Sequence, residues 1–153
     1  ATLAATLHDR PEPLSRCAKT EDDLHQTLGA LRDQGLVLGL VSNTFIPAQV
    51  LDRHLGQERL IEYLPVRVYS CDVRYRKPHR SIFRIATEQT GVPADQTLCV
   101  GDSPAYDIAG ANRCGMVSVL KDPNNRHARH KHAPRHRITR IAELLDLIKK
   151  YNS

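Results

Sequence analysis

From about residue 20 onward, the apolar positions alternate between helical spacing and short uninterrupted runs. Leu24, Leu28 and Leu31 recur every three or four residues, which predicts a helix that ends at Gly35. The run that follows, residues 36–41, is apolar throughout, as is typical of a strand buried on both faces. This alternation predicts an α/β fold in which helices connect the strands of a parallel sheet.

The same alternation continues to the end of the chain. Further strands are predicted at residues 66–69, 98–100 and 116–120, and further helices from Pro47 past Leu55, over 82–91, over 108–115 and over 141–148. Thr20 is a plausible N-cap, because three acidic residues follow it in what would be the first helical turn. Loops are predicted for residues 71–76 and 121–137.

The first twenty residues fit this pattern less well. The sequence ATLAATLHDRPEPL is weakly apolar and contains two prolines, which favours a short strand or helix end followed by a linker. We therefore predict one domain core over residues 21–153 and assign residues 1–20 to a connecting segment outside it.

Composition is ordinary for a globular protein, with 41% hydrophobic and 25% charged residues in 153. No apolar run approaches a membrane span and no secretory signal opens the chain, so we expect no membrane association. The four cysteines, Cys17, Cys71, Cys99 and Cys114, are scattered without a CxxC pair. They indicate reduced thiols in a cytoplasmic protein and disfavour a disulfide framework.

The positive charge is concentrated in one segment. Residues 121–140 contain seven Lys or Arg against the single acid Asp122, a formal +6 in a chain whose total is +5. Residues 121–137 also hold four of the eight histidines. A solvated loop, a patch that binds a polyanion such as nucleic acid or an acidic protein, and a histidine metal site all remain open. The segment lacks the aromatic residues that stack on bases, which disfavours single-stranded nucleic acid.

Polar residues with three different chemical uses follow the predicted strands. Asp102 and Asp107 come after the strand at 98–100 and offer carboxylates to a divalent cation such as Mg²⁺. Ser42 and Asn43 offer hydrogen-bond donors for a phosphoryl oxygen, and Lys77 offers a positive charge. Because the carboxyl ends of parallel strands meet at one edge of a sheet, these residues are predicted to form one site.

In this order the motifs resemble those of the haloacid dehalogenase superfamily of phosphatases and related hydrolases. LVSNT at 40–44 is similar to the second motif of that family, and RKPHRSIFRIA at 76–86 is similar to the third. VGDSPAYDIAGANRCGM at 100–116 is similar to the fourth and is the most specific of them. The resemblance covers roughly residues 21–120.

The resemblance implies a Rossmann-like three-layer α/β/α core, Mg²⁺ dependence, an aspartyl-phosphate intermediate and a small phosphorylated substrate. Carried over, Ser42 would bind the phosphoryl group with help from the backbone at Asn43. Lys77 would stabilise the nucleophile and the phosphoryl group, Asp102 would hold Mg²⁺, and Asp107 would support the same metal site.

The family's first motif, DxDx(T/V), is missing before Ser42. Asp9 is a weak candidate for its nucleophile, because Pro11 stands where the second Asp is expected. We therefore expect a sheet that is incomplete at the N-terminus, with residues 1–20 as a linker or the remnant of a cap domain. A missing upstream segment, a strand such as residues 2–7, or a partner chain would complete the sheet, since unpaired backbone groups inside it are costly.

Two functions remain open at this stage. The first is a Mg²⁺-dependent phosphomonoester phosphatase seen as a partial chain, inactive alone because the nucleophile is absent. The alternative is a non-catalytic binding module of the same fold, which acts through the basic segment 121–140 on a polyanion or a protein partner.

Overall fold

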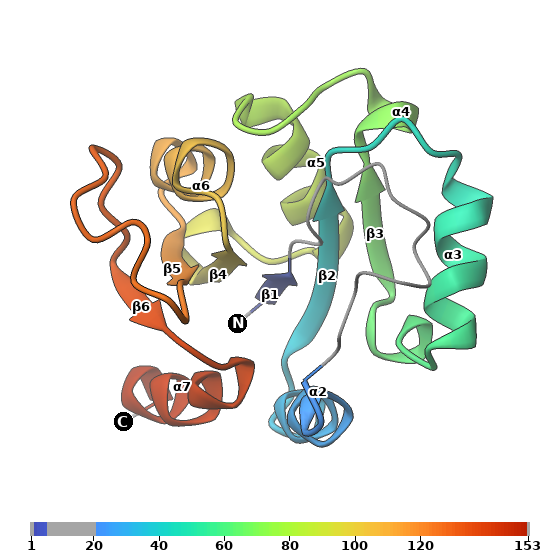
Figure 1. Ribbon diagram of the computed structural model, residues 1–153. Helices are drawn as coiled ribbons and strands as arrows, with labels where there is room; N and C mark the ends of the chain where they lie inside the picture. Colours follow the sequence, from blue (N-terminus) through green and yellow to red (C-terminus); the bar gives the residue numbers. More distant parts are fainter. Residues whose placement is uncertain (1, 6–20, 153) are drawn as a thin grey trace.

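The computed structural model describes residues 2–5 and 21–152 and contains a six-stranded sheet (Figure 1). All neighbouring strands run parallel, in the order β3-β2-β1-β4-β5-β6. The strands are β1 (Thr2–Ala5), β2 (Val37–Ser42), β3 (Val66–Tyr69), β4 (Thr97–Gly101), β5 (Val117–Lys121) and β6 (His136–Ile138).

Helices cover both faces of the sheet and confirm the predicted three-layer α/β/α architecture. The longer helices are α2 (Leu24–Asp33), α3 (Ala48–Gln57), α5 (Arg80–Thr90), α6 (Ala109–Cys114) and α7 (Leu144–Asn152). Shorter turns are η1 (Ile61–Tyr63), α4 (Ser70–Val73), η2 (Ala94–Gln96), the π-helix η3 (Pro104–Ile108) and η4 (Ile141–Glu143). Figure 1 shows α5 and α6 above the strands and α2 and α7 below them.

The run of residues 37–41 in β2 carries no polar side chain, because each of the two faces of this strand meets a layer of helices. Leu38 and Leu40 of β2 belong to the core shared with α2, α3 and α7. The next residue, Val41, belongs to the second core, which contains Phe83 of α5 and Ala111 of α6. Successive side chains of a strand point to opposite faces, so an uninterrupted apolar run is what this double burial requires.

The centre of the sheet differs from the expectation of an incomplete N-terminus. Thr2–Ala5 lies between β2 and β4 and pairs with both, so the position predicted to lack its strand is filled from within the chain. This agrees with the alternative of a strand near residues 2–7. The other residues of the predicted linker, Asp9 and Thr20 among them, lie outside the described residues.

Two local predictions are wrong. Residues 136 and 137 were assigned to a loop but belong to β6, which pairs with β5 through Val119 opposite His136. Residues 71–73 were also assigned to a loop but form part of the short helix α4. Both elements are very short and polar, so tertiary pairing rather than a hydrophobic pattern determines them.

The described cysteines Cys71, Cys99 and Cys114 are free thiols, as the sequence predicted, and Cys17 lies outside the described residues. Within the described part of the chain, no helix is long and apolar enough to cross a membrane.

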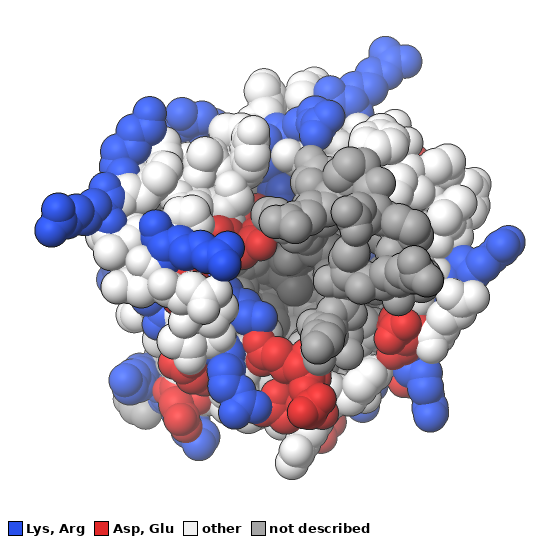
Figure 2. Space-filling view, in the orientation of Figure 1, with Lys and Arg blue, Asp and Glu red and all other residues white. Residues whose placement is uncertain are grey.

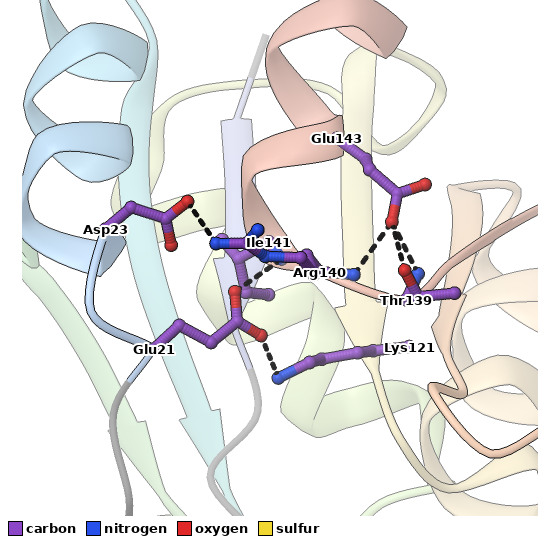
Figure 3. Close-up of polar contacts among 7 residues, drawn as sticks. All are labelled: Glu21, Asp23, Lys121, Thr139, Arg140, Ile141 and Glu143. Carbon is purple, nitrogen blue, oxygen red and sulfur yellow. Dashed lines mark hydrogen bonds and ion pairs between the residues drawn. The ribbon is translucent and has the colours of Figure 1, made fainter.

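A polar cluster joins the start of α2 to the C-terminal part of the chain (Figure 3). Glu21 accepts a hydrogen bond from the backbone N–H of Ile141 at 2.9 Å and forms an ion pair with Lys121 at the end of β5. Asp23 pairs with Arg140 at 2.7 Å. These contacts span about 120 positions of sequence and fix α7 to the face of the sheet that α2 covers.

We predict that Glu21→Ala lowers the free energy of unfolding by about 1–3 kcal/mol, because it removes a charged acceptor from a partly buried N–H. Urea titration of the purified chain measures the change. Asp33→Ala is the control, since Asp33 meets only the exposed Arg32 at 4.0 Å. We expect the control to change stability by less than about 0.5 kcal/mol. Equal losses in the two variants would contradict a structural role for the cluster.

A second prediction concerns Glu143, whose Oε1 accepts hydrogen bonds from the hydroxyl and N–H of Thr139 and from the N–H of Arg140. The Thr139 hydroxyl, followed by the two amides, lowers the pKa of the Glu143 carboxyl. A carboxyl whose folded pKa is depressed adds stability above its unfolded pKa and loses it as the pH falls through the folded pKa. Glu143→Gln should therefore be less stable than the parent at pH 7, and the difference should shrink as the pH falls through the lowered pKa of Glu143. Thermal melts from pH 7 into the acid range test this, and a constant difference would refute it.

Candidate active site

The site lies where the strand order reverses, at the carboxyl ends of β1, β2 and β4. Open parallel sheets place their ligand sites at such a switch point. In the register of the sheet, Ala5 stands opposite Leu40 of β2 and Val100 of β4. Ser42 and Asp102 each follow two residues further along, so they lie on the two sides of the end of β1.

A buried ion pair forms the centre of the site. The Nζ atom of Lys77 lies 2.8 Å from Oδ1 of Asp107, with side chains 3% and 0% exposed. Lys77 Nζ also donates to the carbonyl of Val41 at 3.1 Å, and Asp107 Oδ2 accepts from the N–H of Ser103 at 3.0 Å. Two buried charges need such partners, because removing either charge leaves the other uncompensated.

Asp107 reaches this position through an unusual turn. Residues Pro104–Ile108 form a π-helix, in which the N–H of Ile108 bonds the carbonyl of Ser103 at 3.3 Å. Such wide turns are rare and occur frequently at functional sites. Asp107 then packs directly against Gly101, where an added Cβ would lie 2.3 Å from its carboxyl carbon. Only glycine at position 101 leaves room for this carboxylate.

The loop after β2 is held by side chains on both sides. The side-chain amide of Asn43 accepts a hydrogen bond from the N–H of Lys77 at 2.7 Å and donates one to the Lys77 carbonyl at 3.1 Å. This carbonyl belongs to the cis Lys77–Pro78 peptide bond. The Ser70 hydroxyl accepts from the N–H of Thr44 and donates to its carbonyl. The loop therefore positions the buried lysine rather than moving independently of it.

The structure brings the five predicted site residues to one edge of the sheet. Asn43, Lys77 and Asp107 are connected by direct contacts. Ser42 is 7% exposed at the end of β2, and its hydroxyl makes no hydrogen bond to another residue that the structure describes. Asp102 is partly buried immediately after β4.

Three residues of the site were not singled out by sequence reasoning: Gly101, Ser70 and Ser103. Ser103 precedes Pro104 and its hydroxyl accepts from the N–H of Tyr106, a capping pattern that the Ser-Pro pair indicates. Ser70 has no local signal, because its partner Thr44 lies 26 positions away.

Burial also sets the protonation of a nearby thiol. Cys99 of β4 lies next to the ion pair, and burial, followed by the Asp107 carboxylate, raises its pKa to about 12. A thiol with this pKa stays protonated at neutral pH and behaves as a small apolar side chain.

The two aspartates differ in their fitness to hold a metal ion. Both oxygens of Asp107 already bind protein groups, whereas Asp102 stands at the edge of the sheet. Over residues 21–152, no cluster of three or more His, Cys, Asp or Glu side chains could hold a metal. A site with a single carboxylate suits Mg²⁺, which keeps several of its water ligands when a protein binds it. The absence of a cluster among the described residues also disfavours a metal site at the histidines of 121–137.

Comparison with known proteins identifies one family. The family described as haloacid dehalogenase-like hydrolase matches residues 9–115. A ribulose-1,5-bisphosphate 5-phosphatase of Halopiger xanaduensis is 31% identical over 136 residues, 82% of this chain and 55% of that protein. The phosphoglycolate phosphatase of Escherichia coli is 38% identical over 93 residues, 61% of this chain and 36% of that protein.

A solved structure agrees with these sequences. A phosphatase from Thermococcus onnurineus superposes with a TM-score of 0.73 at 29% identity, covering 84% of this chain and 58% of that one. The chain therefore spans between about a third and somewhat over half of the length of these relatives.

We predict that Gly101→Ala displaces Asp107 and destabilises the fold by about 2–4 kcal/mol, since the Cβ meets the carboxylate of a buried ion pair. Gly56→Ala on α3 is the matched control, because nothing lies within 4 Å of its Cβ. Because Gly56 lies in the last turn of α3, Gly56→Ala should leave stability unchanged or raise it by up to about 0.5 kcal/mol. Urea unfolding measures both, and a neutral Gly101→Ala would show that Asp107 does not depend on this contact.

Proposed function

The chain belongs to the haloacid dehalogenase-like hydrolases, and we propose that its site binds small phosphomonoesters together with Mg²⁺. The observation that carries the proposal is the buried pair of Lys77 and Asp107, held in place by Asn43 and Gly101. A lysine fixed at the carboxyl end of the sheet presents one positive charge at a defined point, which suits the charge of a phosphoryl group.

Each side chain has a role that follows from its contacts. The Ser42 hydroxyl and the backbone N–H of Asn43 would donate hydrogen bonds to phosphoryl oxygens. The side-chain amide of Asn43 is engaged with Lys77, so its contribution is to position that residue. Asp107 orients the Lys77 ammonium, and its hydrogen bond from the N–H of Ser103 orders the turn that follows Asp102.

Asp102 is the residue that would hold Mg²⁺, with Asp107 in a supporting position. When bound, the metal would offset negative charge on the phosphoryl oxygens. The substrate class is a small phosphorylated metabolite, in line with the relatives named for ribulose-1,5-bisphosphate and phosphoglycolate.

Turnover through an aspartyl-phosphate requires a nucleophilic aspartate at the end of β1. No Asp-x-Asp pair precedes Ser42 in the sequence, and Asp9 lies outside the described residues. We therefore expect this chain to bind phosphate and Mg²⁺ but not to hydrolyse p-nitrophenyl phosphate. Robust hydrolysis that is lost in Asp9→Asn would instead identify Asp9 as the nucleophile.

The binding prediction is tested by calorimetric titration of inorganic phosphate with and without Mg²⁺. Phosphate binding should require Mg²⁺. The Asp102→Asn variant should bind phosphate much more weakly, and added Mg²⁺ should no longer strengthen its binding. Ser42→Ala should weaken binding by about tenfold or more, because it removes a hydrogen bond to a charged ligand. Asp95→Asn is the control, since this exposed carboxylate lies before β4, at its opposite end. A phosphate affinity that changes neither when Mg²⁺ is left out nor in Asp102→Asn would refute the proposal.

A further inference from the structure

The segment between β5 and β6, residues 122–135, is anchored to the protein at its start. Asp122 is 9% exposed, and its two carboxylate oxygens accept from the N–H groups of Arg126 and His127, each at 2.9 Å. Arg137 of β6 approaches the same carboxylate at 3.4 Å. Burial acts to raise the pKa of Asp122, but the hydrogen bonds from the His127 and Arg126 backbone lower it below its ordinary value. The carboxylate therefore stays charged and is bound by groups of its own loop.

The far end of the segment is anchored to α6 and β5. The side-chain amide of Asn112 donates to the carbonyl of Ala133 at 3.0 Å. The Ser118 hydroxyl accepts from the N–H of Arg135 at 3.1 Å and donates to Asn112 at 2.6 Å. The segment is thus a structured part of the surface, and its middle residues project from a backbone fixed at both ends.

The cations of residues 121–140 divide into two groups. Lys121, Arg137 and Arg140 form ion pairs with Glu21, Asp122 and Asp23, so they serve the fold. A second group is exposed and makes no ion pair with any carboxylate that the structure describes. Its members are Arg126, Arg129, Lys131 and Arg135, joined by Arg113 at the end of α6. Figure 2 shows Lys and Arg side chains along the left margin, where Figure 1 places this segment.

We propose that this second group forms a surface that binds the phosphate backbone of a nucleic-acid duplex through charge. Interfaces with proteins usually centre on a buried apolar core, in which arginines lie beside aromatic side chains, and membrane-bound segments insert apolar side chains. None of the exposed large apolar side chains lies in 122–135; they are Phe45, Val50, Tyr75, Tyr106 and Tyr151. A partner recognised here is bound by charge alone, and the phosphate backbone is the polyanion that proteins bind in this way.

The residue types on this surface also favour a nucleic-acid duplex as its partner. Four of its five cations are arginines, whose planar guanidinium forms paired hydrogen bonds with phosphate oxygens. The surface contains no Phe, Tyr or Trp to stack on unpaired bases, which favours a duplex, whose backbone is contacted without unstacking bases.

Three imidazoles lie among these cations. The ring centroids of His127 and His130 are 6.2 Å apart, and those of His130 and His132 are 5.5 Å apart. His132 faces Lys131 and His130 on its own segment and Arg113 on α6; partial burial, followed by these cations, lowers its pKa. The nearby carboxylate, Asp122, is held by the loop.

The test is fluorescence anisotropy of a labelled 20-base-pair RNA duplex titrated with the full chain at several salt concentrations. Five phosphate contacts predict a slope of log affinity against log salt of about −4.5, or a loss of about 500-fold from 50 to 200 mM salt. The variant with Arg126, Arg129, Lys131 and Arg135 changed to Gln should lose most of the affinity and about 3.6 units of the slope.

The matched control changes Arg53, Arg59, Arg74 and Arg84 to Gln. These residues are exposed on other parts of the surface, and both variants lower the formal net charge from +5 to +1. We expect the control to weaken binding by less than about threefold. Equal losses in the two variants would overturn the proposal, since they would reflect net charge alone. Absence of duplex binding by the parent chain at 50 mM salt would also overturn it.

A further arm addresses the identity of the partner. Tighter binding to poly-glutamate or to vesicles containing phosphatidylserine than to the duplex at equal salt would overturn the nucleic-acid assignment. Because the duplex assay contains no Mg²⁺, its result is independent of the phosphate site proposed at Asp102.

Discussion

The buried ion pair between Lys77 and Asp107 is the interaction on which the architecture of the site depends. Each charge would cost several kcal/mol to remove from water without its partner, so both must be satisfied together. The pair also binds backbone groups, the carbonyl of Val41 on β2 and the N–H of Ser103 after β4. The pair therefore does more than join two side chains: it holds the ends of two strands, with β1 between them, in one arrangement.

The residues around the pair follow from the space and the hydrogen bonds it requires. Gly101 leaves room for the Asp107 carboxylate, and the π-helix beginning at Pro104 turns that side chain back toward the sheet. The same helical segment continues into α6, where Gly110 lets the ring of Phe83 approach to within 2.2 Å of where a Cβ would stand. Close packing of α5 against α6 and close packing of Asp107 against β4 are thus consequences of two glycines nine positions apart. A site that must be rigid is in this way supported by the core beneath it.

The parts of this structure that sequence reasoning predicted are those with a strong local pattern. The apolar runs of β2 and β4 predicted buried parallel strands, and the order of Ser42, Lys77 and Asp102 predicted where a site would form. The position of Thr2–Ala5 in the centre of the sheet was not predicted as the leading alternative, because TLAA is short and weakly apolar and its place depends on pairing with β2 and β4. The hydrogen bonds between the Asn43 side chain and the Lys77 backbone were also not predicted from the sequence. They join residues 34 positions apart, and an Asn after a strand predicts only a donor and an acceptor without identifying their partners.

Charge is used in three distinct ways in this chain, and the difference lies in what surrounds each cation. Lys77 is buried and neutralised at a fixed point, so its effect on a ligand depends on geometry and little on salt. Lys121 and Arg140 meet Glu21 and Asp23 and connect distant parts of the chain. The arginines of 122–135 have no such partner among the described residues, and Asp122, the only acid in that stretch, is held by backbone N–H groups of its own loop. The basic pI of about 9.2 is therefore a property of one segment rather than of the molecule as a whole. The proposed binding at that segment would depend on ionic strength, whereas the proposed binding at the strand ends would depend on fit.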